Sequence, residues 1–97
     1  MWRWLKQWLR PVAQDQVQQL LAEAMQLGLT ARDAAIAQEY LDYANPDLAF
    51  DQIIIQLFEY GTPLTADFYD LVEGCADSLH IPTQEYTILL LLIKATA

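Results

Sequence analysis

The sequence predicts an all-α protein, a single-domain bundle of about five short helices around a central apolar helix over residues 46–60. The chain has 97 residues, of which 55% are hydrophobic and only three are Gly. Such a composition is typical of a folded helical chain and not of a disordered chain or a disulfide scaffold. Apolar residues also recur at helical spacing in segments that Gly or Pro residues separate. We therefore treat residues 1–97 as one helical domain with a modest core.

The predicted central helix has clear start and stop signals. Asn45 can cap its first backbone N–H groups, Pro46 suits the first helical position, and Gly61 suits a left-handed stop. At 100° per residue its apolar side chains form one broad arc, which consists of Ala49, Phe50, Ile53, Ile54, Leu57, Phe58 and Tyr60. Leu48 and Ile55 lie outside this arc. We expect neighbours on more than one side of so apolar a helix, and this places it at the centre of the bundle.

Residues 1–10 form a predicted amphipathic N-terminal helix, which Pro11 is expected to end or kink. Its two halves carry three tryptophans and three cations respectively: Trp2, Trp4 and Trp8, then Arg3, Lys6 and Arg10. One interpretation is an interfacial membrane helix with aromatic anchors and a basic polar face. The other is a helix that closes one end of the bundle. We favour the second interpretation because ten residues bind a bilayer weakly without a further signal.

Two capped helices precede the central one. The helix after Pro11 is expected to stop at Gly28, which can adopt the left-handed conformation. Thr30 opens the next helix, and Asp33, three residues later, completes a pattern close to a capping box. We expect this second helix to bury one apolar face, formed by Ile36, Ala37, Tyr40, Tyr43 and Ala44.

Two segments follow the central helix. Thr65 can cap a helix over residues 66–80 that divides cleanly into an apolar face and an acidic face. Residues 86–93 are apolar all round and rich in leucine, so we expect a buried helix there, with a buried strand as the lesser alternative. No apolar run approaches the roughly twenty residues that a membrane span needs.

Side chains for catalysis or metal binding are scarce. His80 and Cys75 cannot make a four-ligand metal site without carboxylates from elsewhere, and Cys75 falls on the apolar side of its helix. The isolated glycines form no phosphate-binding loop. We therefore expect no enzyme activity, no metal and no cofactor. The lone cysteine and the absence of a secretory signal favour a cytoplasmic protein.

The charge is unevenly distributed. The net charge is −8, but residues 11–97 set only Arg32 and Lys94 against all thirteen carboxylates. Such a body repels nucleic acid and attracts basic partners. Four carboxylates line one side of the helix over residues 66–80 and are called the acidic ridge below: Asp67, Asp70, Glu73 and Asp77. Like charges at this spacing cost a few tenths of a kcal/mol, which favours a role in binding, although acidic proteins commonly expose such faces.

One part of the chain resembles a known family. After an aromatic-ended helix, the matching positions are Leu48-Ala49-Phe50, the run from Leu57 to Thr65, Phe68-Tyr69 with Leu71, and Leu79-His80-Ile81. In these positions residues 40–93 resemble a MafI-family immunity protein, one of the small antidotes encoded beside polymorphic bacterial toxins. The resemblance implies an all-helical domain that binds a cognate secreted toxin, often a nuclease, and blocks it stoichiometrically. It implies no particular toxin-contacting residues, because these vary with each toxin.

Two functional hypotheses follow from the sequence. The first is an immunity or antitoxin-like protein whose acidic ridge and other acidic helix faces meet a basic toxin domain. The second is a small helical adaptor, peripheral at a membrane, in which the Trp/Arg-rich residues 1–10 are the working part.

Overall fold

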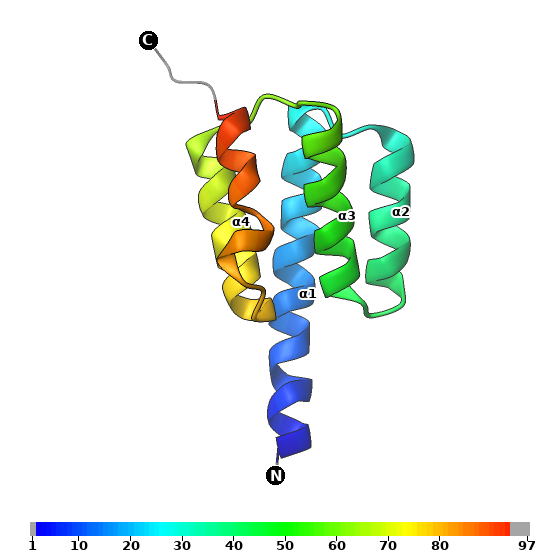
Figure 1. Cartoon of the computed structure of the whole chain (residues 1–97). Coiled ribbons are helices and arrows are strands. Elements are labelled where there is room, and N and C mark those ends of the chain that lie inside the picture. The colour runs from blue at the N-terminus through cyan, green and yellow to red at the C-terminus, as the bar shows by residue number, and fades with distance from the viewer. Residues whose placement is uncertain (1, 94–97) are drawn as a thin grey trace.

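Four α-helices and two short 3-10 segments make up the computed structural model, which describes the backbone of residues 2–93 and the side chains of residues 12–93. In chain order they are α1 (Trp2–Leu27), α2 (Ala31–Asp42), α3 (Pro46–Glu59), α4 (Ala66–Leu79), η1 (Thr83–Glu85) and η2 (Thr87–Leu92). Figure 1 shows the α-helices packed side by side, with η2 next to α3. The predicted all-α bundle is therefore confirmed.

The core lies where α1 and α3 meet, because each of these two helices contacts all the other α-helices. Phe50, Ile53 and Leu57 of α3 are at most 1% exposed, and Val17 and Leu20 of α1 are fully buried. Apolar burial of this kind contributes about 25 cal/mol per Å² to folding. The predicted central helix, α3, is therefore central in the bundle, and α1 is equally central.

The N-terminal helix is longer than predicted. A single helix, Trp2–Leu27, runs through Pro11, so the expected end at this residue is wrong. Proline removes one backbone hydrogen bond, but its φ of about −65° fits a helix, and the apolar stripe that follows supports continuation. The predictions for the N-terminal helix depend on the side chains of Trp2, Trp4 and Trp8. These three side chains lie outside the described ones.

Each α-helix ends in the same backbone arrangement, the Schellman motif, in which a residue with positive φ reverses the chain. The four reversing residues are Gly28, Ala44, Gly61 and His80, with φ of 128°, 58°, 59° and 58°. After α3, for example, the Thr62 N–H donates to the Leu57 carbonyl at 3.0 Å. Both predicted glycine stops are confirmed. The other two positions carry a Cβ, which makes the left-handed conformation unfavourable.

The helix starts follow the sequence in two cases out of three. Asp33 N–H donates to the Thr30 hydroxyl oxygen at 3.1 Å, and this hydroxyl donates to the Asp33 carboxylate at 2.8 Å. Thr65 accepts a hydrogen bond from the third residue of α4 at 3.0 Å. Asn45 makes no side-chain cap, although its own N–H donates to the Tyr40 carbonyl at 2.8 Å in the preceding helix stop. The predicted Asn45 cap is therefore wrong.

α2 is rotated relative to the prediction. Its inner face consists of Ala34, Ala37 and Leu41, whereas Tyr40 is half-buried and Tyr43 is 73% exposed. The small alanines let α2 approach α1 and α3 closely, and the bulky tyrosines then lie at the edges of the contact. Only Ala37 of the predicted face is fully buried.

The C-terminal segment is a helix, as predicted, but it is a 3-10 helix that is buried on only one side. η2 is a 3-10 helix with three residues per turn, so residues three apart share one side. Leu89 and Leu92 face the core, while Ile88 and Leu91 lie on another side and are exposed. The sequence of residues 86–93 could not show which side of η2 is buried, because every side carries aliphatic residues.

The stop after α2 generates a testable prediction. Replacing Ala44 by Gly removes a Cβ from a residue at φ 58° and should raise the free energy of unfolding by about 1 kcal/mol. The matched control is Ala35→Gly, on the exposed side of α2, which should lower it by about 1 kcal/mol. Urea unfolding measures both. Equal destabilisation by the two variants would contradict the left-handed stop.

Candidate protein-binding surfaces

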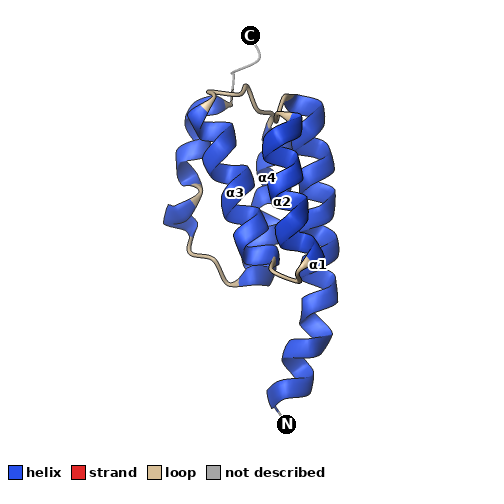
Figure 2. Ribbon diagram, turned by 90° about the vertical axis from the view of Figure 1, so that its right-hand side faces the viewer, coloured by secondary structure: helices blue, strands red, loops and turns tan. Residues whose placement is uncertain are grey.

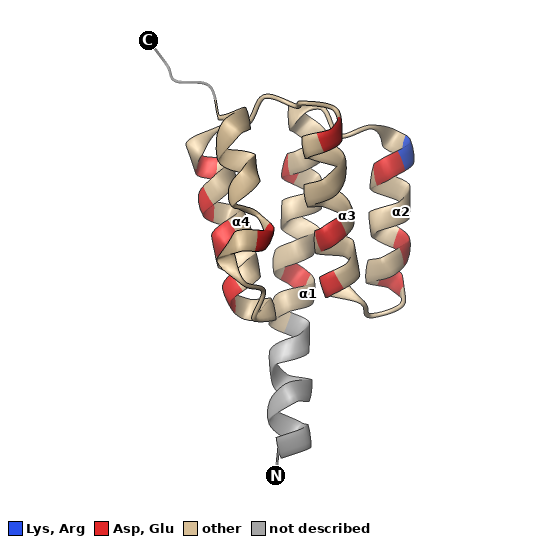
Figure 3. Cartoon of the chain, in the orientation of Figure 1, with Lys and Arg blue, Asp and Glu red and all other residues tan. Residues whose placement is uncertain are grey.

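The acidic ridge lies on the outer side of α4. All four of its carboxylates are exposed, as predicted, and Figure 3 shows them along the length of that helix. Tyr69 lies next to the ridge in sequence but is buried. Burial raises the pKa of the Tyr69 phenol, and the Glu73 carboxylate raises it further. The ridge is thus a one-sided row of anions on a well-packed helix, and its contact with a partner stays a prediction.

Negative charge extends well beyond α4. In the described side chains, residues 12–93, Arg32 is the one basic residue against all thirteen carboxylates. Figure 3 shows acidic residues on every α-helix and a single basic one at the start of α2. Since like charges repel over a Debye length of about 8 Å, this surface disfavours anionic ligands and favours cationic ones.

A second acidic group joins segments far apart in the sequence. It consists of Asp47 and Asp51, one turn apart on α3, and Glu85 of η1, and is called the carboxylate trio below. Partial desolvation raises the pKa of Asp51, and repulsion from Glu85 and Asp47 raises it further, although the side chain stays exposed. The ionised form of Asp51 is therefore disfavoured in the folded protein.

Exposed apolar side chains occur on α3 and on η2. On α3 they are Leu48, Ile55 and Phe58, which are 43%, 53% and 39% exposed. On the neighbouring η2 they are Ile88 and Leu91. We call these five residues the α3/η2 face. The prediction that Leu48 and Ile55 lie outside the buried arc agrees with their exposure, whereas Phe58 was expected to be buried.

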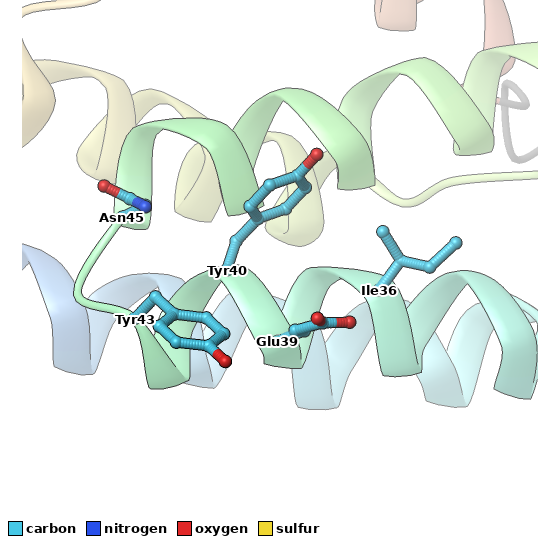
Figure 4. A pocket seen from close by; sticks show the side chains of 5 residues that line it. All are labelled: Ile36, Glu39, Tyr40, Tyr43 and Asn45. Atoms are coloured by element: carbon cyan, nitrogen blue, oxygen red, sulfur yellow. The ribbon is translucent and has the colours of Figure 1, made fainter.

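A shallow hollow lies between the end of α2 and the start of α3. Its volume is about 250 Å³, and its lining consists of Ile36, Glu39, Tyr40, Tyr43 and Asn45. Figure 4 shows the Tyr40 ring pointing toward α3 and the Glu39 carboxylate between Tyr43 and Ile36 along α2. The lining thus combines two aromatic rings, one carboxylate and one amide in a hollow that is open to solvent.

The residues considered for chemistry are not assembled into a reactive site. Cys75 is 1% exposed, and its thiol donates to the Gln16 carbonyl at 3.4 Å. Burial raises the pKa of the Cys75 thiol to about 12, which keeps it protonated near neutral pH. His80 is exposed at the stop after α4. Within the described part of the chain, no three His, Cys, Asp or Glu residues are grouped to hold a metal ion.

Comparison with known proteins does not assign this chain to a family. No protein-family model matches this chain, and no curated protein or solved structure matches it either. None of the helices in the described residues has both the length and the apolar character needed to cross a membrane.

The carboxylate trio generates a prediction about pH. Because the pKa of Asp51 is raised in the folded protein, its ionisation lowers stability as the pH rises above the ordinary value of 3.8. Asp51→Asn should therefore stabilise the protein at pH 7, and the gain should shrink as the pH is lowered toward 3.8. The measurement is urea unfolding across this range.

The control is Glu23→Gln, which makes the same change in net charge on the exposed side of α1. An equal gain from both variants at pH 7 would mean that net charge, and not the local trio, is responsible.

Proposed function

We propose that this chain is an immunity-type protein that binds and neutralises a basic bacterial toxin domain. The observation that supports the proposal best is the charge asymmetry, since residues 12–93 carry thirteen carboxylates and one arginine. The MafI-like pattern over residues 40–93 supplies the class of partner. A toxin that acts on nucleic acid needs a cationic surface to hold phosphates. An acidic antidote to such a toxin gains both faster association and specificity.

The described surfaces suit protein binding better than catalysis. The thiol of Cys75 is buried and protonated, and the hollow beside α2 contains one carboxylate. By contrast, the acidic ridge, the carboxylate trio and the α3/η2 face are exposed over several helical turns. Protein interfaces combine an apolar centre with a polar rim, and these surfaces supply both kinds of group.

The sequence of residues 1–10 favours a second candidate, a peripheral membrane module. Three tryptophans opposite three cations are the composition of an interfacial helix. Under this proposal the intact protein binds anionic vesicles in a salt-sensitive way, and deletion of residues 1–10 abolishes binding without lowering the melting temperature. If the segment only stabilises the bundle, the deletion lowers the melting temperature and vesicle binding is negligible before and after it.

A neutralisation assay tests the leading proposal. The probe is the C-terminal domain of the protein encoded immediately upstream of this chain's gene, expressed in a bacterial host with and without the chain. The proposal predicts that the domain is basic and toxic, that co-expression restores growth, and that the two proteins purify as a stoichiometric complex. A neighbouring gene without such a domain, or toxicity that persists on co-expression, would contradict it.

The acidic ridge gives a prediction about association kinetics. Changing Asp70, Glu73 and Asp77 to Asn, Gln and Asn should leave folding intact, because all three are exposed and the changes relieve like-charge repulsion. Association with the toxin domain should slow, and the difference should shrink as salt rises, because exposed charges act chiefly by steering. Stopped-flow measurements at low and high salt report both effects.

A triple variant of equal charge change on other helices provides the control: Asp15→Asn, Glu23→Gln and Glu39→Gln. If both triple variants associate at the same rate, the total charge steers the partner and the ridge has no special role.

A further inference from the structure

α3 is apolar on two opposite sides, and packing within the chain accounts for only one of them. Its inner side chains are at most 1% exposed at Phe50, Ile53 and Leu57. Its outer side carries Leu48 and Ile55 seven residues apart, which is two helical turns and therefore one side. Burial of these two residues contributes little to the stability of the free protein, because both stay about half in water.

η2 extends this apolar surface with a second element. Figures 1 and 2 both show the C-terminal segments lying against α3. The Tyr86 ring, just before η2, meets Phe50 of α3 edge to face with centroids 6.4 Å apart. At the other end of η2 the Leu64 N–H donates to the Leu92 carbonyl at 2.9 Å. These contacts hold η2 in place at both ends, so its exposed Ile88 belongs to a preformed surface.

Carboxylates lie beside the apolar residues of this surface. Asp51 is one turn from both Leu48 and Ile55 on α3, and Glu85 approaches it from η1. Repulsion within the carboxylate trio is relieved when a cation approaches. A second copy of the chain would bring a further trio and an equally acidic body against the first, which electrostatic repulsion disfavours. The negative charge around the apolar face therefore favours a basic protein partner over a second copy of the chain.

We infer that the α3/η2 face is the docking surface for a basic protein partner, which buries Leu48 and Ile55 at the centre of the contact and places Lys or Arg side chains against the carboxylate trio. This inference rests on the proposed toxin-neutralising function and locates its main contact. It assigns different roles to the two acidic surfaces. The ridge on α4 accelerates encounter, whereas the α3/η2 face determines how long the complex lasts.

The test is a pair of matched double variants. Leu48→Ala with Ile55→Ala should weaken binding of the neighbouring toxin domain about tenfold or more, mainly through faster dissociation, with a melting temperature close to that of the control variant. The control is Val12→Ala with Met25→Ala, which removes two side chains of similar exposure from α1 and should leave binding unchanged. Surface plasmon resonance gives the rates. Equal affinity of wild type and the Leu48/Ile55 variant overturns the inference, while neutralisation by wild type leaves the proposed function standing.

A second probe decides the inference if wild type neutralises no neighbouring domain. The probe is a helical peptide composed only of Leu and Lys in an amphipathic pattern, with oligolysine as its control, and backbone amide NMR shifts are followed. The inference predicts shifts confined to α3 and residues 85–92 for the amphipathic peptide, and lost in the Leu48/Ile55 variant. Shifts centred on α4, or none, overturn it. A concentration-dependent dimer that the variant abolishes also overturns it, because the occupant is then a second copy.

Discussion

α3 carries more apolar surface than a bundle of this size can cover, and both the core and the outer surface depend on this constraint. Phe50, Ile53 and Leu57 are buried in the shared core, and α3 contacts α1, α2, α4 and η2. A domain of about 100 residues has few elements left to cover the opposite side. η2 packs against α3 but leaves Leu48 and Ile55 in contact with water.

Sequence patterns predicted the elements whose signals are local, and failed where the outcome depends on packing. α3 and α4 could be predicted because glycine, proline and threonine mark most of their ends and their apolar faces are broad. The α2 face could not, because alanines form the contact and the larger Tyr40 and Tyr43 misled the assignment. Likewise, a run of leucines has no polar residue to reveal the three-residue period of η2. Ala44 and His80 carry no glycine signal for the left-handed stops that they form.

For the binding surfaces, too, local sequence signals could be predicted and contacts made by packing could not. The acidic ridge could be predicted because its members share one helix and recur at helical spacing. The carboxylate trio could not, since Glu85 affects the pKa of Asp51 only when η1 folds against the bundle. Desolvation and repulsion from the other two carboxylates of the trio disfavour the ionised form of Asp51, which lies one turn from the exposed Leu48 and Ile55. A surface that combines both features is better suited to a partner than to stability, which is the physical basis of the proposed docking role.

Hydrogen–deuterium exchange of the free chain and of its complex with the neighbouring toxin domain tests this account most directly. In the free protein, the backbone amides of α3 should exchange slowly, because its inner face is the centre of the core. In the complex, additional protection should appear on α3 and on residues 85–92, with little change along α4. Protection that appears on α4 or around the α2 hollow, with α3 and η2 unchanged, would contradict it.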